Sequence, residues 1–319
     1  MTLKSALIFG CDGQDGSLLC KSLLRKNINV IGTVRNKLKT ISNLSKLGIE
    51  EEVKIQICDI KEFKTIAKLI ETHKPNTIYN LAAQSSVGKS FQDPNETVQS
   101  IVNGTLNILE ASKQINYDGR IFFAGSSEIF GHTETAASIN YPQQPCNPYA
   151  ISKQTSLNLV TLYREVNNLK CMTGVLFNHE SPLRSNAFVT QKIISGAIKC
   201  SQDPSHILTL GNLEISRDWG WAEEYVEGMQ LIANSQEIKD YVVCTGELNQ
   251  LSTFIKIAFE KLNLNWLDHV RSDSFLKRKN DIVKSYGNPS EMNKDLGWKT
   301  EEKLEQVIEK LLDYKLSQL

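Results

Sequence analysis

Short apolar runs alternate with segments of helical periodicity through the first half of the sequence. A run without polar alternation is typical of a strand buried on both faces of a parallel sheet, and an amphipathic segment after it supplies the crossover helix. The pattern predicts strands at 6–9, 30–34, 53–57, 77–81, 120–124 and 172–177, and helices at 13–24, 63–70, 98–111 and 149–167. We therefore expect an α/β fold, a Rossmann-type doubly wound parallel sheet.

The pattern loosens after residue 177, where the polar segment NHESPLRSN begins. Apolar spacing beyond it predicts helices at 189–200, 219–234, 251–262 and 301–316, and short strands at 207–212 and 241–244. We expect two domains. The first is a Rossmann domain of residues 1–177 plus about 218–244. The second is a smaller, discontinuous C-terminal substrate-binding domain of residues 178–217 plus 245–319.

Composition narrows the classes of partner. The 319 residues carry 36 basic and 36 acidic side chains, so a global basic field for nucleic acid is absent. No apolar run approaches the roughly 20 residues of a membrane span, and MTLKSALIFG is too short in apolar sequence for a signal peptide. Seven cysteines without a CxxC pair predict reduced thiols in a cytoplasmic protein, and neither a disulfide framework nor a metal site.

Three glycines lie between the first strand and the first helix, as Gly10, Gly13 and Gly16 in GCDGQDG. Glycines at this spacing permit a tight turn and let a pyrophosphate approach the unpaired N–H groups at the start of a helix. A glycine motif alone is a weak signal, but this one has a strand before it and a helix after it. The loop therefore predicts a dinucleotide site.

The residues after the next strands indicate which dinucleotide is bound. An acidic residue after the second strand usually holds the ribose hydroxyls of NAD, whereas Arg35 stands here, followed by Asn36 and Lys37. A cation at this place favours the 2′-phosphate of NADP. Asp59, after the third strand, is placed either to reach the adenine or to cap a helix. The small residues in NLAAQSS, Ala82 and Ala83, allow the backbone to lie along the cofactor.

Tyr149 and Lys153 are one helical turn apart, so both side chains can face one ligand. A free tyrosine is a poor base at neutral pH, but a neighbouring ammonium and a nicotinamide charge favour its phenolate. Tyr149 could then accept a proton from a sugar hydroxyl during hydride transfer, with Ser126 hydrogen-bonded to the same hydroxyl. The three residues predict a hydride-transfer site.

Glu128 adds a second acid/base group, two residues beyond Ser126. Simple reductases need only the serine, tyrosine and lysine, so the carboxylate indicates that a second proton moves. Once C4 of a hexose is a ketone, its C5 proton is acidic, and a base that removes it can protonate the C6 hydroxyl and expel water. The plain alternative is a solvated loop carboxylate or a helix cap.

These segments resemble the extended short-chain dehydrogenase/reductase superfamily and, within it, the GDP-mannose 4,6-dehydratase family. The resemblance covers nearly the whole chain, through GCDGQDG, IYNLAAQSSVGKSF, SSEIFG, VLFNHESPLRSNAFVTQKI and GNLEISRDWGWAEEYVEGM. NHESP and GNLxxxRDWG are typical of this family rather than of the superfamily. The resemblance implies the same catalytic roles for Ser126, Glu128, Tyr149 and Lys153.

The resemblance also implies the ligand contacts. Further cofactor contacts would come from Gln14, Asp15, Ile60 and Leu81. Asn178 and Glu180 would meet the sugar or the diphosphate, and Ser85 would also contact the substrate. The base pocket would be lined by Val189, Lys192, Leu210 and Asn212. Arg217 and Arg278 would neutralise the diphosphate, a task suited to guanidinium groups, with Asp281 nearby in place of a glutamate.

Several positions depart from the family pattern. Asp12 stands for a usual threonine, and the loop after Arg35, which reaches a neighbouring subunit in the family, is shorter by several residues. We therefore expect either a homodimer or a homotetramer. The remaining departures lie around the sugar pocket, and they keep a related GDP-linked sugar such as a heptose open: Ser86, Gly88, Cys146, Asn147 and Trp221.

The leading hypothesis is NADP-dependent dehydration of a GDP-linked sugar, GDP-mannose first, to its 4-keto-6-deoxy derivative. A 4-keto reductase or epimerase of the same superfamily is the alternative, and it would not need Glu128. A third hypothesis is a non-catalytic NADP-sensing protein. Such proteins usually lose a catalytic residue, and this chain retains the whole set.

Overall fold

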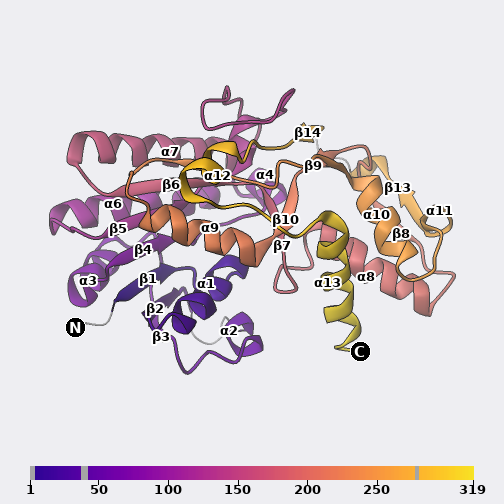
Figure 1. Cartoon of the computed structure of the whole chain (residues 1–319), viewed down its shortest axis with the longest axis horizontal. Helices are drawn as coiled ribbons and strands as arrows, with labels where there is room; N and C mark the ends of the chain where they lie inside the picture. Colours follow the sequence, from indigo (N-terminus) through magenta and orange to yellow (C-terminus); the bar gives the residue numbers. More distant parts are fainter. Residues whose placement is uncertain (1–3, 37–41, 277–279) are drawn as a thin grey trace.

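The computed structural model describes residues 4–36, 42–276 and 280–319. Its centre is a seven-stranded sheet in the order β11-β6-β5-β4-β1-β2-β3, and every neighbouring pair is parallel. Figure 1 shows this sheet on the left of the molecule. The strands are β1 Ser5–Phe9, β2 Asn29–Val34, β3 Lys54–Ile57, β4 Thr77–Asn80, β5 Arg120–Ala124, β6 Cys171–Leu176 and β11 Tyr241–Val243. The doubly wound parallel sheet expected from the sequence is confirmed.

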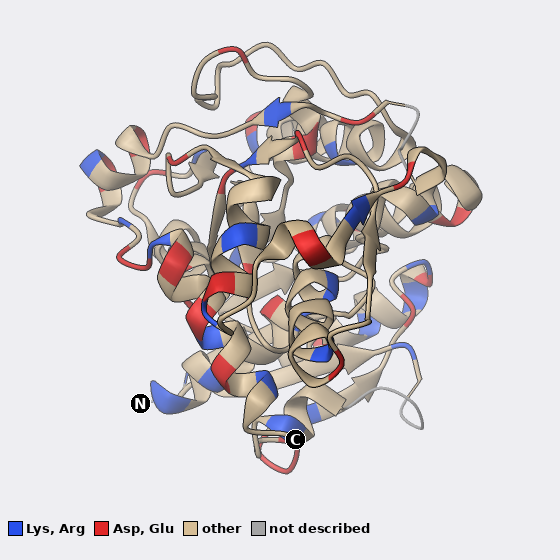
Figure 2. Ribbon diagram, turned by 90° about the vertical axis from the view of Figure 1, so that its right-hand side faces the viewer, with Lys and Arg blue, Asp and Glu red and all other residues tan. Residues whose placement is uncertain are grey.

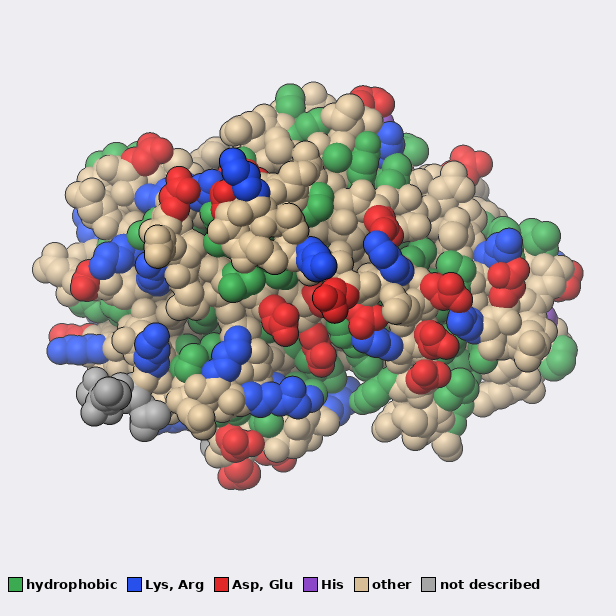
Figure 3. Space-filling model, viewed as in Figure 1, with side chains coloured by type: hydrophobic (Ala, Val, Ile, Leu, Met, Phe, Trp, Pro, Cys, Tyr) green, Lys and Arg blue, Asp and Glu red, His purple; other side chains and the backbone are tan. Residues whose placement is uncertain are grey.

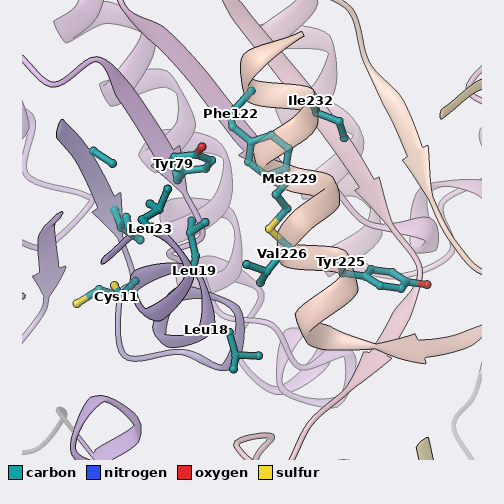
Figure 4. Packing of buried hydrophobic residues seen from close by; sticks show 14 of the residues in the cluster. Cys11, Leu18, Leu19, Leu23, Tyr79, Phe122, Tyr225, Val226, Met229 and Ile232 are labelled. Carbon is teal, nitrogen blue, oxygen red and sulfur yellow. The ribbon is translucent and has the colours of Figure 1, made fainter. Parts of the chain in front are cut away.

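Helices cover both faces of the sheet. On one face lie α1 (Gln14–Arg25), α2 (Ser42–Lys46) and α9 (Ala222–Asn234), and on the other α3 (Phe63–His73), α6 (Gly104–Gln114) and α7 (Pro148–Asn167). Figure 4 shows the core of the first face, where α1 and α9 meet over β4 and β5. Its labelled side chains include Leu19, Tyr79, Phe122, Val226 and Met229, each nearly inaccessible to solvent. Burial of this kind contributes about 1.5–3 kcal/mol for each large side chain.

The helical segment before β5 is longer and less regular than the sequence predicts. Helices α4 (Val87–Gln92) and α5 (Pro94–Val98) lead into a π-helical turn at Gln99–Asn103, which continues directly as α6. Asp93 caps α5 by accepting a hydrogen bond from Glu96 N at 3.0 Å, with Pro94 in the first turn. The 98–111 prediction therefore marked only the middle of a continuous helical run.

A second unit lies on the right in Figure 1 and has its own apolar core between α8, α10 and α13. The division into two domains at the expected bounds stays a prediction. Three small sheets belong to this part of the chain: β10-β7, β12-β9-β14 and β13-β8. Their strands are β7 Asn178–Glu180, β8 Leu208–Leu210, β9 Ser216–Arg217, β10 Trp219–Trp221, β12 Asn249–Gln250, β13 Val270–Ser272 and β14 Lys284–Ser285. The helices of this unit are α8 Val189–Gln202, α10 Leu251–Glu260, α11 Trp266–His269 and α13 Leu304–Leu316, with a short 3₁₀ turn at Ser274–Leu276. Helix α12 (Ser290–Leu296) instead packs against β11, and its Met292 joins the core of α1 and α9.

Two expected helices begin later than predicted. The helix expected at 219–234 starts at Ala222, because its first three residues form β10 and pair in parallel with β7. The helix expected at 301–316 starts at Leu304, because the N–H groups of Glu301 and Glu302 donate to the Glu224 carboxylate at 2.7 and 3.1 Å. Both errors come from contacts with distant parts of the chain, which periodicity does not report.

Charged side chains of both signs are mixed over the surface. Figure 2 shows acidic and basic residues interspersed along the ribbon, and Figure 3 shows both on the face that it presents. The part of the chain that the structure describes contains no helix both long and apolar enough to span a membrane. All seven cysteines fall in this part and are unpaired, six of them buried and Cys146 partly exposed.

Candidate active site

A cleft of about 1250 Å³ opens at the carboxyl edge of the sheet, between the sheet and the second unit. Parallel sheets bind their ligands at this edge, where the loops after the strands gather. The structure brings most of the residues singled out in the sequence to its walls: Gly13, Gln14, Asp15, Gly16, Leu81, Ala83, Ser85, Ser126, Glu128, Tyr149, Lys153, Asn178, Glu180, Val189, Lys192, Leu210, Asn212, Arg217 and Asp281.

Some expected contacts lie elsewhere. Gly10 and Ala82 are packed together beneath the cleft, and Arg35, Asp59 and Ile60 lie outside its lining, after β2 and β3. Arg278 and Lys37 fall outside the described residues.

The glycine loop is closed by contacts that only glycine allows. Gly10 has φ +82, and a Cβ there would lie 2.8 Å from the Ala82 Cα. A Cβ on Gly16 would overlap the carbonyl oxygen of Gly10. Gly13 precedes α1 without a side-chain cap, so the first N–H groups of the helix face an open cradle. The loop therefore fits the pyrophosphate of a nicotinamide dinucleotide.

A small charge cluster lies outside the lining of the cleft, after β2 and β3. Arg35 lies 3.2 Å from one oxygen of Glu96, and Lys61 lies 2.9 Å from the other. Asp59 Oδ1 accepts a hydrogen bond from Lys61 N at 3.0 Å, while the cap position of α3 belongs to Glu62. Lys61 was not singled out in the sequence. Its place two residues beyond Asp59, after a strand end, was the available signal.

Helix α7 carries the tyrosine and the lysine. Lys153 Nζ lies 5.7 Å from the centre of the Tyr149 ring and donates a hydrogen bond to Ala124 O at 2.7 Å. Burial lowers the pKa of Lys153 to about 8 and raises the pKa of Tyr149 to about 12, although a hydrogen bond with Ser126 partly offsets the latter. In the free protein the phenol is therefore protonated at neutral pH.

Ser126 and Glu128 lie on the loop after β5. Ser126 has an extended backbone and caps a 3₁₀ turn at Ser127–Phe130, its Oγ accepting a hydrogen bond from Glu128 N at 3.3 Å. The Glu128 carboxylate accepts a hydrogen bond from Asn147 Nδ2 at 2.8 Å. The carboxylate and the Tyr149 phenol thus reach the same cleft from two different elements.

A buried ion pair that the sequence analysis missed joins the glycine loop to β7. His179 Nε2 lies 3.0 Å from Asp15 Oδ1, and His179 Nδ1 donates to Phe177 O at 2.7 Å. Burial opposes charge on both groups, yet their mutual attraction raises the pKa of His179 and lowers that of Asp15 to about 2. Gln14 Nε2 also donates to His179 O at 3.2 Å. The signal was present, because GQDG and NHES both stood out as motifs.

The Glu180 side chain, which we expected to contact the substrate, instead contacts residues of its own chain. Its Oε2 accepts a hydrogen bond from Thr190 Oγ1 at 2.7 Å and lies 3.3 Å from Arg184 Nε. Arg184 in turn donates to His179 O at 2.9 Å and stacks on the Phe188 ring. Glu180 therefore shapes the wall of the cleft, and Arg184 is a cation that the sequence analysis did not name.

Arg217 is buried in β9, and its guanidinium lies 3.7 Å from Asp281 Oδ1. The neighbouring Asp218 accepts hydrogen bonds from Thr245 N and Gly246 N, both at 2.9 Å. Burial raises the pKa of Asp218 to about 6. These hydrogen bonds anchor the segment that follows β9, and Arg217 presents a guanidinium, a group suited to an anionic ligand, to the cleft.

Known proteins match the chain over nearly its whole length. A family model described as GDP-mannose 4,6 dehydratase matches residues 7–311. The chain is 35% identical to GDP-mannose 4,6 dehydratase 1 of Arabidopsis thaliana, covering 97% of this chain and 89% of the relative. It is 31% identical to GDP-mannose 4,6-dehydratase of Vibrio cholerae, covering 100% and 95%.

Solved structures share the fold. A UDP-glucose 4-epimerase from Thermotoga maritima has a TM-score of 0.88 at 19% identity, covering 98% of this chain and 99% of that one. A dTDP-glucose 4,6-dehydratase from Bacillus anthracis has a TM-score of 0.85 at 16% identity, covering 98% and 97%. At identities of 19% and 16%, these two structures show only that the fold is shared. The family is shown by the family model and by the sequence relatives. The chain belongs to the GDP-mannose 4,6 dehydratase family of nucleotide-sugar dehydratases.

Proposed function

We propose that the protein removes water from a GDP-linked sugar, with GDP-mannose as the first candidate, and forms the 4-keto-6-deoxy derivative. The observation that carries this proposal is the presence of Ser126, Glu128, Tyr149 and Lys153 in one cleft of a chain from this family. The glycine cradle fits a nicotinamide dinucleotide, which when bound would accept the C4 hydride and later return it to C6.

The chain's own residues handle the protons of the first step. Tyr149 takes the proton of the C4 hydroxyl, and Ser126 accepts or donates a hydrogen bond at the same oxygen. The Lys153 ammonium lies beside the ring and favours the phenolate electrostatically. These roles account for oxidation at C4. When the hydride is later returned to C6, the proton that Tyr149 took can be delivered to C5, which completes the reduction and leaves C4 as the ketone.

Glu128 accounts for the loss of water. With C4 oxidised, the carboxylate removes the C5 proton, and the resulting acid protonates the C6 hydroxyl, which leaves as water. The net change is the loss of one water, so the nicotinamide couple is regenerated within one turnover. A 4-keto reductase or epimerase does not require this carboxylate, so Glu128 separates the two candidate functions.

The experiment is incubation of the purified protein with GDP-mannose and, separately, with a GDP-heptose, followed by mass spectrometry. Loss of one water without net consumption of reduced cofactor supports the proposal and identifies the sugar. No dehydration of any GDP-sugar refutes it, and steady consumption of NADPH would reassign the protein as a reductase. In a Glu128→Gln variant, normal exchange of the C5 proton with solvent deuterium would remove Glu128 from the mechanism.

NADP is proposed as the cofactor because two cations, Arg35 and Lys61, stand where an adenosine 2′-phosphate would be met. NAD would leave Arg35 and Lys61 paired only with carboxylates of the protein, Glu96 and, for Lys61, also Asp59. The ratio of kcat/KM values for the two cofactors tests this preference, and a ratio favouring NAD refutes it.

We further propose a homodimer, in the cytoplasm, that forms through α7. Ile151, Leu162 and Val166 are at least half exposed and share one face of that helix. A tetramer would involve the loop after Arg35, much of which falls outside the described residues. Sedimentation of the protein and of an Ile151→Lys, Leu162→Lys variant tests the dimer. A dimer that survives both substitutions refutes this interface.

A further inference from the structure

Asn147 touches both halves of the catalytic site. Its Nδ2 donates to Glu128 Oε2 at 2.8 Å, and its Oδ1 accepts the hydrogen bond of Ala150 N, also at 2.8 Å. The second contact is the N-terminal cap of α7, the helix that carries Tyr149 and Lys153. One planar amide therefore joins the carboxylate on the β5 loop to the start of the tyrosine helix.

The amide is held in a fixed place. Asn147 is 3% exposed, and its backbone is extended, with φ −150 and ψ 162. The following Pro148 restricts Asn147 to such a conformation and begins α7 with a preset φ. The partners also fix the orientation of the amide, because a carboxylate only accepts and a backbone N–H only donates.

Few side chains could make both contacts. The cap needs an acceptor and Glu128 needs a donor, and the two lie on opposite ends of the asparagine amide. A serine is a good cap but has a single oxygen nearer the backbone, and an aspartate caps well but has no hydrogen to give. The other polar atom near Nδ2 is the Cys146 sulfur at 3.9 Å, a weak acceptor. Glu128 is thus the strong partner of this N–H.

We propose that Asn147 is a positioning residue that fixes the Glu128 carboxylate relative to Tyr149. The carboxylate can then reach the C5 proton and the C6 hydroxyl while Tyr149 contacts the oxygen on C4. This inference rests on the proposed role of Glu128 as the base. The three carbons are adjacent in one sugar, and a small displacement of a catalytic group lowers a rate steeply. Loss of the amide contact should therefore slow the elimination and leave the oxidation at C4 largely intact.

The test compares Asn147→Ser with Asn147→Asp, because both side chains retain a cap and only the contact with Glu128 changes. We expect the serine variant to fold normally and to form the 4-keto-6-deoxy product about 10- to 100-fold more slowly, at an unchanged KM. Reduced cofactor should accumulate during its turnover, because oxidation outpaces water loss. The aspartate variant should lose more, since its carboxylate faces Glu128.

Three outcomes would overturn the inference. The first is a serine variant with the native rate and no accumulation of reduced cofactor. The second is equal slowing of oxidation and elimination, which would leave Asn147 as a helix cap alone. The third is an additive effect of the two substitutions. If Asn147 acts through Glu128, Asn147→Ser should cause no further loss of C5 exchange in a Glu128→Gln background, and a further loss would contradict the inference. A Glu128→Gln enzyme with full activity would instead refute the proposed function, so the two failures are distinguishable.

Discussion

If NADP is the cofactor, as proposed, replacing Arg35 by Ala is expected to weaken its binding relative to NAD. Arg35 follows β2, and its guanidinium is paired with Glu96 at 3.2 Å. Lys61 is paired with the other oxygen of the same carboxylate at 2.9 Å. Glu96 therefore lies between the two cations. If NADP is the cofactor, as proposed, its 2′-phosphate would replace Glu96 as their anionic partner.

The size of the effect depends on that exchange. The Arg35 side chain is 69% exposed and that of Glu96 28%, so their pair is worth about 0.2–1 kcal/mol in water. A hydrogen bond from the guanidinium to a phosphate is worth about 1.5–3 kcal/mol. The difference, about 0.5–2.8 kcal/mol, corresponds to roughly a 2- to 100-fold weaker binding of NADP by Arg35→Ala.

The assay is a titration of each cofactor into the native protein and the variant at fixed ionic strength, with kcat/KM as a second readout. NAD should bind both proteins equally, because its ribose carries no phosphate at this position. Glu96→Gln is the matched control. It removes the competing charge and should tighten NADP by a few-fold without affecting NAD. Equal weakening of both cofactors by Arg35→Ala, or no change for either, would refute the reasoning.

Three further predictions address other parts of the site. Gly16→Ala should weaken cofactor binding by at least about tenfold, because its Cβ would overlap the Gly10 carbonyl, while the calorimetric transition stays cooperative. Cys146 should be the first cysteine to be alkylated in the folded protein, because the other six are buried. Burial also raises the pKa of its thiol, so the alkylation rate should still be rising at alkaline pH as more thiolate forms. An unlabelled Cys146 in peptide mapping would contradict this. Lys153→Met should abolish turnover yet resist urea better at pH 7. Burial lowers the pKa of Lys153 to about 8 from 10.5, so the unfolded chain binds the extra proton between these values. The free energy of unfolding of the native enzyme should then rise by up to about 3 kcal/mol between pH 8 and 10.5. The methionine variant should lack this rise.

The sequence predicted the features that depend on local pattern. Continuous apolar runs identified the buried strands, and the glycines of GCDGQDG identified a turn that the structure builds with Gly10 at φ +82. Its main errors lie where a distant segment changes a local preference. The residues Trp219–Trp221 continue the helical spacing of α9, yet they pair with β7, some 40 residues earlier.

The contacts missed in the site have the same origin. Asp15 and His179 are 164 positions apart in the chain, and neither residue alone predicts an ion pair. Arg35 and Glu96 are separated by 61 positions, and Asn147 and Glu128 by 19. Residue type and spacing predicted which side chains reach the cleft, but a partner brought near by the sheet topology is visible only in three dimensions.

The fold does not decide whether water leaves the sugar. A UDP-glucose 4-epimerase shares this architecture at a TM-score of 0.88, so one fold serves both kinds of reaction. The difference must therefore lie in groups that the sheet itself does not dictate. Here these are a carboxylate on a four-residue 3₁₀ turn and the amide that holds it. Since Asn147 is also the cap of α7, it links the Glu128 carboxylate to the helix that carries Tyr149 and Lys153. We therefore expect a shift of the carboxylate and a shift of this helix to be coupled. On this reasoning, Asn147→Ser should slow removal of the C5 proton in this protein more than oxidation at C4, because the Glu128 carboxylate would lose the hydrogen bond that holds it.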